Sequence, residues 1–331
     1  MNTTEQAVPE TVSTQSDLPV LDGTWELKKR NPTASAILGL LGVGAIYFQV
    51  QSFGTVFLMM IYGAFNNMHS ANKNIFEITN VLGNIKIPLL VMLCVVQYVL
   101  FLWGSVWMTK RWHSSNVKAY LRVQYKGWKP ILLAVVTTVL FLPVCYFISA
   151  HLQGLYKVPE SLNKAEEGLF QAKSGFEFWL LVFVICVTPA ICEEIFFRGF
   201  FQRTLERNLG AKSVLIGGIL FGLFHMQPLG LLTLSILGIL FSLYFYRSKS
   251  LFPSMASHFT NNLIAILLVN NAWALDVFGK SPAYLIWVST VVAFFCLYFF
   301  IVTTRNPQLA NVLPIVIEPV PGGSEQIKVT Q

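Results

Sequence analysis

The sequence has few charged residues for its length. Only 12% of its 331 residues are Asp, Glu, Lys or Arg, while 54% are hydrophobic. Soluble domains carry about 25% charged residues. The missing charge leaves uncharged apolar stretches, and stretches of roughly 18 residues or more indicate membrane-spanning helices. The composition therefore excludes an ordinary soluble domain and predicts an integral, multi-pass membrane protein.

Three further absences narrow the class. The five cysteines show neither CxxC spacing nor a disulfide framework, so we interpret them as small buried hydrophobes. Residues 1–27 lack the apolar segment of a cleavable signal peptide, so we expect the first span to direct insertion. The net charge of +7 does not indicate a nucleic-acid partner, because the basic residues lie beside apolar spans, where they set orientation.

Apolar segments dominate what is present. The first runs from Thr33 to Phe65 without a charge and contains Gln49 and Gln51, so one tilted helix and a hairpin of two helices are both open at this point. Seven further segments follow it. They lie near residues 87–108, 131–151, 176–192, 213–227, 229–246, 251–269 and 282–303.

Basic residues mark every second connection between these segments. They precede the first span at Lys28–Arg30 and follow the last at Arg305, and the connection at 109–130 contains six of them. The positive-inside rule then places these connections, and both termini, in the cytoplasm. A hairpin in the first stretch would break this alternation. We therefore predict an all-α bundle of about eight transmembrane spans. We favour a bacterial plasma membrane, because residues 328–331 do not form a retention signal of a eukaryotic organelle.

The chain divides into regions of different composition. In the basic cytoplasmic loop 109–130, cations alternate with Trp and Tyr, which is typical of a segment lying on anionic lipid headgroups, with substrate contact as the alternative. The expected regions are a disordered cytoplasmic tail (1–30), an N-terminal transmembrane region (31–175), a catalytic core (176–270), a last transmembrane helix (271–305) and a cytoplasmic tail (306–331).

Ionisable side chains within spans are costly, so each needs an explanation. The first group is Glu193, Glu194 and Arg198, at the predicted cytoplasmic end of the fourth span. Glu194 and Arg198 are four residues apart and can pair on one helical face. Glu193 is then turned about 100 degrees away and is free to act on another group. A juxtamembrane salt bridge is the alternative for this group alone.

Two more groups lie on the fifth and seventh predicted spans. They are Phe221 with His225, and His258 with Asn262 four residues further on. Hydrogen bonds between helices would account for either one alone. Together with Glu193, they supply side chains suited to general-base catalysis, an amide donor for an oxyanion, and a Glu-His-His set that can bind zinc.

The ordered set resembles a known family. Glu193-Glu194-x-x-x-Arg198, Phe221-x-x-x-His225 and His258-x-x-x-Asn262 are similar to the three motifs of the CAAX-protease and bacteriocin-processing family, also called the Abi family. The resemblance covers roughly residues 176–270.

The resemblance implies an eight-helix intramembrane endopeptidase whose site is open to the cytosol. Glu193 and His225 would activate a water, His258 and Asn262 would hold the oxyanion, and Glu194 and Arg198 would orient Glu193. Phe221 would have a supporting role.

We favour the metal-free, glutamate-type mechanism with no cofactor. The alternative is a zinc metalloprotease with Glu193, His225 and His258 as ligands. The expected substrate is a peptide or membrane protein. Two rival functions are a non-catalytic immunity or scaffold protein, in which the same polar residues only join helices, and a transporter with helices interrupted by Pro228 and Pro253.

Overall fold

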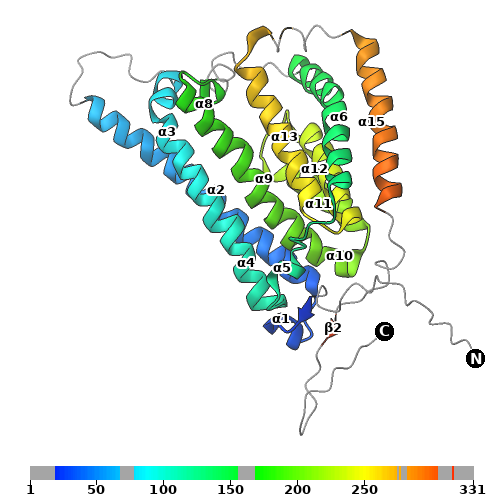
Figure 1. Ribbon diagram of the computed structural model, residues 1–331. Coiled ribbons are helices and arrows are strands. Elements are labelled where there is room, and N and C mark those ends of the chain that lie inside the picture. Colours follow the sequence, from blue (N-terminus) through cyan, green and yellow to red (C-terminus); the bar gives the residue numbers. More distant parts are fainter. Residues whose placement is uncertain are drawn as a thin grey trace, which may run out of the picture.

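The computed structural model describes residues 19–67, 78–155, 168–273, 276, 282–304 and 315–316. Most of both predicted tails lies outside these residues. Within them, seven helices are long and apolar enough to cross a membrane, and an eighth apolar helix, α11 (Lys212–Phe224), is shorter. The helices lie side by side in one bundle (Figure 1). The predicted all-α, polytopic fold is therefore confirmed.

The helices follow the predicted apolar segments. Several are continuous chains of α-helical and π-helical (η) parts. In chain order the elements are β1 (Val20–Leu21), α1 (Thr24–Leu27), α2 (Pro32–Asn67), α3 (Ile78–Val96), η2 (Gln97–Trp103), α4 (Gly104–Met108), η3 (Thr109–His113), α5 (Val117–Tyr120), α6 (Trp128–Leu155), α8 (Gly175–Leu181), η4 (Val182–Val187), α9 (Thr188–Glu193), η5 (Glu194–Gln202), α10 (Arg203–Leu209), α11, α12 (Leu231–Ser248), α13 (Phe252–Val269), α15 (Ala283–Thr303) and β2 (Ile315–Val316).

The first apolar stretch forms one helix. Helix α2 contains 36 residues, which corresponds to about 54 Å of helix. It crosses the bundle obliquely (Figure 1). A helix longer than the roughly 30 Å hydrocarbon layer accommodates its length by tilting or by extending beyond the layer. The absence of a break agrees with the alternation of basic connections that favoured one span.

The fourth span is longer than predicted. We expected it to end at residue 192, with Glu193 at its cytoplasmic end, but the helix is continuous from Gly175 to Leu209. Glu193 thus lies near the middle of a 35-residue helix. The charges did not end the span because Glu194 and Arg198 neutralise each other inside the protein, where both are fully buried.

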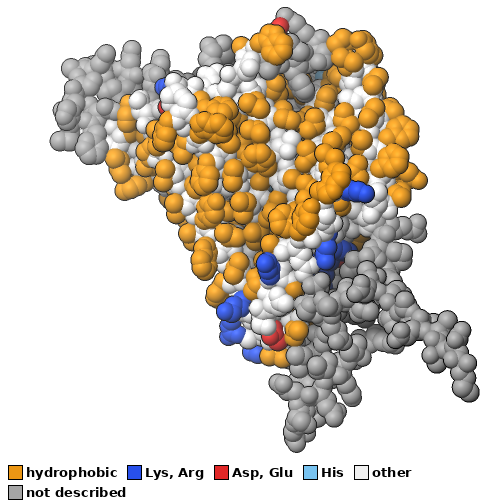
Figure 2. Space-filling view, viewed as in Figure 1, with side chains coloured by type: hydrophobic (Ala, Val, Ile, Leu, Met, Phe, Trp, Pro, Cys, Tyr) orange, Lys and Arg blue, Asp and Glu red, His pale blue; other side chains and the backbone are white. Residues whose placement is uncertain are grey.

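The surface has an apolar belt and a cationic end. On the face in Figure 2, hydrophobic side chains cover most of the bundle, and Lys and Arg gather at its lower end. Large apolar side chains exposed on the bundle include Phe53, Trp103 and Phe294. The start of α2 and the end of α15 both point to the cationic end (Figure 1). The cytoplasmic orientation of that end stays a prediction.

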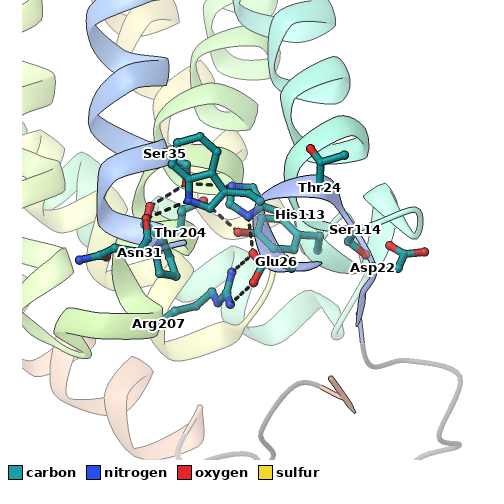
Figure 3. Close-up of polar contacts among 12 residues, drawn as sticks. Asp22, Thr24, Glu26, Asn31, Ser35, His113, Ser114, Thr204 and Arg207 are labelled. Atoms are coloured by element: carbon teal, nitrogen blue, oxygen red, sulfur yellow. Dashed lines mark hydrogen bonds and ion pairs between the residues drawn. The ribbon is translucent and has the colours of Figure 1, made fainter. Parts of the chain in front are cut away.

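The prediction of disorder for residues 1–30 is wrong for residues 19–30. This segment packs against η3 and α10 around the carboxylate of Glu26 (Figure 3). Both guanidinium nitrogens of Arg207 donate to Glu26, at 2.5 and 2.8 Å, and its Oε1 lies 2.6 Å from Nδ1 of His113. These partners are 87 and 181 residues away in the sequence, so composition did not reveal them.

Part of the basic loop 109–130 is embedded in the protein. Tyr120 is fully buried, and Arg122 forms two hydrogen bonds to Glu206 of α10, at 2.7 and 2.8 Å. Trp128 is exposed. The loop therefore has a structural role at the cationic end, and its contact with anionic headgroups stays a prediction.

Close packing of α11 against α12 depends on glycine. A Cβ placed on Gly218 would lie 2.5 Å from Cα of Ile239, and one placed on Gly238 would lie 2.5 Å from the carbonyl oxygen of Gly218. Only residues without a side chain allow backbones to approach so closely. Gly218 and Gly222 thus give α11 a face of small residues against α12, and this contact fixes the position of the helix end that carries His225.

Candidate active site

Residues of the three motifs line one cavity of about 370 Å³. Glu193, His225, His258 and Asn262 all line it. They come from α9, the C-terminal end of α11, and α13. Its other lining residues are Gln97, Phe170, Val184, Ile185, Pro189, Phe221, Gln227, Leu234, Leu237, Phe241, Asn261, Ala265, Ile266 and Val269.

Glu193 is held at one oxygen. It is 8% exposed, and Nε2 of Gln97 donates to its Oε1 at 3.3 Å. Among the described residues, the structure shows no hydrogen-bond partner for its buried Oε2. A buried carboxylate oxygen needs a donor, so this atom is the one that a reacting water or substrate group would meet. The motif analysis did not single out Gln97, although an amide inside the apolar segment 87–108 was a usable signal.

Glu194 and Arg198 contact His258 rather than Glu193. Nη1 of Arg198 donates to Oε1 of Glu194 at 2.7 Å, and Nη2 donates to the carbonyl of Gly238 at 3.1 Å. The same Oε1 lies 2.9 Å from Nδ1 of His258. A carboxylate only accepts, so Nδ1 of His258 carries the proton, and Nε2 is left for another partner. The ion pair thus orients the second histidine, which differs from the role that we expected.

His225 is oriented by its own helix. It is the residue that ends α11, and its Nδ1 lies 2.8 Å from the carbonyl oxygen of Phe221. Because a carbonyl cannot donate, Nδ1 carries the proton here as well. In the neutral ring, Nε2 then has a free lone pair. This tautomer is the one that a general base requires.

The ring of Phe221 joins the three motifs. The guanidinium of Arg198 lies 4.3 Å from its centroid, within the range of a cation–π contact. The rings of His225 and His258 lie 4.7 and 5.7 Å from it, both edge-on. Phe221 thus contacts both imidazoles with its ring and accepts from His225 with its carbonyl, while its supporting role stays a prediction.

The amide of Asn262 also joins two helices. Its Nδ2 donates to the carbonyl of Ile185 in η4 at 2.8 Å, and its Oδ1 accepts from Asn261 at 2.9 Å. One of its two N–H groups is thus used for packing, and the other is available to a second acceptor. Glu194 and Ile185 both belong to π-helical segments, which frequently occur at functional sites.

The described residues do not form a group of three or more His, Cys, Asp or Glu side chains placed to hold a metal ion. Glu193, His225 and His258 line the same cavity but do not have the spacing of a zinc ligand set. The residues present therefore do not fit a zinc ion in this arrangement, and we derive no step through one.

Comparison with known proteins agrees with the motifs. Residues 175–264 match the family model described as type II CAAX prenyl endopeptidase Rce1-like. No curated protein and no solved structure matches the chain significantly. The matched segment covers less than a third of the chain, but it contains Glu193, His225, His258 and Asn262. This segment is therefore similar to the integral membrane endopeptidases of the CAAX-protease and bacteriocin-processing family.

Proposed function

We propose that the protein hydrolyses a peptide bond within the membrane, with a water activated by Glu193 and His225 and an oxyanion held by His258 and Asn262. One observation supports this above all others: these four side chains, from three separate helices, line a single cavity. A set of residues used only to join helices has no need to share one cavity.

The water would be activated by two acceptors. Oε2 of Glu193, which has no described partner, accepts one proton as the water oxygen attacks the peptide carbonyl. Nε2 of His225 accepts a hydrogen bond from the other water hydrogen, because its Nδ1 proton is committed to the carbonyl of Phe221. When the C–N bond breaks, Glu193 returns its proton to the amine nitrogen. The products are a free amine and a carboxylate, whose remaining proton leaves through His225.

The oxyanion would be held by the second histidine and the amide. With Nδ1–H directed at Glu194, a protonated His258 can donate from Nε2 to the oxyanion. Glu194, held in turn by Arg198, fixes the orientation of this ring. The free N–H of Asn262 supplies a second donor. This arrangement explains why a buried Glu–Arg pair is retained beside the cavity.

The substrate is proposed to be a peptide or membrane-protein segment that reaches the cavity from the bilayer. The family description names CAAX prenyl substrates. A quenched fluorescent peptide ending in a prenylated CAAX sequence, its unprenylated copy and an unrelated apolar peptide therefore form the first substrate set. Cleavage is measured in detergent and in proteoliposomes, with and without a chelator, and bound zinc is quantified. Activity that survives the chelator in a zinc-free preparation supports the glutamate mechanism.

Substitution at Glu193 and His225 is the direct test. We expect Glu193→Ala, Glu193→Gln and His225→Ala to lower cleavage by about 100-fold or more, the scale of a lost general base. His151→Ala is a matched control, since Nδ1 of His151 lies 3.0 Å from the carbonyl four residues earlier, but the residue is exposed and outside the cavity. Full cleavage by Glu193→Gln would favour the non-catalytic role, in which polarity alone matters.

A further inference from the structure

The cavity has a polar half and an apolar half. On α13, its lining extends from His258 to Val269, which spans about 16 Å of helix. The polar groups lie around His258. The distal half is lined by aliphatic residues, and hydrolysis uses none of them. They are Val184, Ile185, Ala265, Ile266 and Val269.

A short segment, residues 168–173, lies at the distal end of the cavity. The side chain of Phe170 is itself part of the cavity lining. Phe170 and Ala172 also pack against an apolar cluster. The buried members of this cluster are Leu90, Leu181, Val182, Val184, Cys186 and Ile266.

Side chains from two different helices hold the backbone of this segment. Asn270, at the end of α13, donates to the carbonyl of Phe170 at 2.9 Å and accepts from the N–H of Ala172 at 2.7 Å. From the opposite side, Nζ of Lys86 in α3 donates to the carbonyl of Gln171 at 2.5 Å. Three consecutive residues are thus fixed by their peptide groups. The ring of Phe170 has no part in these bonds.

Lys86, the cation that holds this segment, is unusually buried. Lys86 is only 3% exposed, and lysine is rarely buried unless it is paired. Its carboxylate partner, Glu177, lies 3.5 Å away, further than the carbonyl of Gln171. Packing of α3 alone would be satisfied by an apolar residue. A buried ammonium directed at one peptide carbonyl indicates that the position of residues 168–173 matters.

We propose that residues 168–173 form a lid over the distal end of the cavity, in which Phe170 limits the size of the apolar substrate side chain that the cavity accepts. Lys86 and Asn270 hold the lid closed. The size limit depends on the proposed endopeptidase function. The lid itself does not, so the two can be tested separately.

Thiol accessibility tests the lid without any cleavage. Ile266 lines the cavity and is 2% exposed, so a cysteine there should react slowly with a water-soluble maleimide. Adding Asn270→Ala or Lys86→Met to Ile266→Cys should raise the labelling rate about tenfold or more. Lys129→Met, an exposed lysine at the cationic end, is the matched control, and the unsubstituted protein gives the background of the five native cysteines.

A conservative variant, Asn270→Asp, distinguishes opening of the lid from misfolding of the protein. Asn270→Asp keeps the acceptor for the N–H of Ala172 and loses the donor to the carbonyl of Phe170. Its labelling rate should lie between those of the parent and Asn270→Ala. Equal rates in the parent, Asn270→Asp, Asn270→Ala and Lys86→Met would show that residues 168–173 do not cover the cavity, and the lid would be rejected.

Selectivity tests the role of Phe170. Peptides that differ in one apolar side chain are compared by their ratio of kcat/KM values. Phe170→Ala should shift this ratio about tenfold towards the larger side chain, and Phe170→Trp towards the smaller, since one or two methylene groups discriminate on that scale. Phe178→Ala, a half-buried phenylalanine that packs on the same cluster outside the cavity, should leave it unchanged.

The outcomes of the two tests separate the hypotheses. A change in labelling without a change in selectivity retains the lid and rejects the size limit. If no peptide is cleaved by the parent protein, the proposed function fails, and the labelling result still decides the lid. Unchanged labelling in a fully active protein rejects the lid alone.

Discussion

A methyl group at Gly218 should misplace His225, the proposed partner of Glu193 in activating water, without touching it. In Gly218→Ala, the new Cβ would lie 2.5 Å from Cα of Ile239, whereas ordinary contacts begin at 3.4 Å. The obstructing atoms are backbone atoms of α12, so no side chain can rotate away. The two helices must therefore separate by about 1 Å, the difference between an ordinary contact and this one. His225 ends the displaced helix.

The expected losses follow from this shift. Overpacking of a tight interface typically costs about 1–3 kcal/mol. Separation of α11 from α12 also moves the carbonyl of Gly238 away from Arg198, which donates to it at 3.1 Å. A misplacement of 1 Å in a catalytic group reduces turnover by about 100-fold. We expect a loss of activity of that size, together with a lower apparent Tm.

Thermal unfolding in detergent and peptide cleavage are the two measurements. Gly42→Ala in α2 is the matched control, because nothing lies within 4 Å of a Cβ at that position. It should keep full activity and stabilise the helix by about 0.5–1 kcal/mol. If Gly218→Ala kept the activity and Tm of the parent, the close helix contact would not be what positions His225.

Two further predictions concern buried charges. Arg198→Lys should lower kcat/KM at least about tenfold with the fold intact by circular dichroism, because one ammonium cannot replace the planar guanidinium that orients Glu194; activity equal to the parent would contradict this. Glu26→Gln should destabilise the protein above pH 4.5, the ordinary pKa of the group. Burial alone would raise the pKa of Glu26, but hydrogen bonds from Arg207 and His113 outweigh it and lower that pKa, so the stabilising contribution is lost as pH falls through the lower value. Denaturation from pH 3 to 7 should show the difference from the parent shrinking with acid, and a constant difference would refute the assignment.

Apolar length was the feature that the sequence encoded most clearly. All eight predicted segments are helices, and the charge-free stretch from Thr33 to Phe65 lies within the single helix α2. The reason is local: backbone groups in lipid must be satisfied within their own helix, so each segment needs little information from the rest of the chain.

Predictions failed where the partner of a charge is distant in sequence. Hydropathy treats each charge as unpaired, so it ended the fourth span near Glu193, although the helix continues to Leu209. Residues 19–30 seemed disordered because the arginine that pairs with Glu26 lies 181 residues away. Neither error could be corrected from local composition.

The sequence motifs predicted which residues share the cavity better than they predicted the contacts between those residues. The motifs identified four residues that line one cavity. They did not reveal that Glu194 lies 2.9 Å from His258, or that Gln97 donates to Glu193 from the second span. Spacing of four residues identifies neighbours on one helix, whereas contacts between helices depend on their relative rotation, which spacing does not fix.

The shortness of α11 affects how water can reach a site within the membrane. With 13 residues, the helix rises only about 20 Å, too little to cross the hydrocarbon layer. It ends at His225, and the turn that follows satisfies the carbonyls of Gly222 and Leu223 with the N–H groups of His225 and Met226. A helix end within the membrane is stable only where protein groups or a water-filled cavity satisfy its backbone. The end of α11 therefore faces the cavity rather than lipid, so its imidazole lies at a space inside the protein that is large enough to hold water.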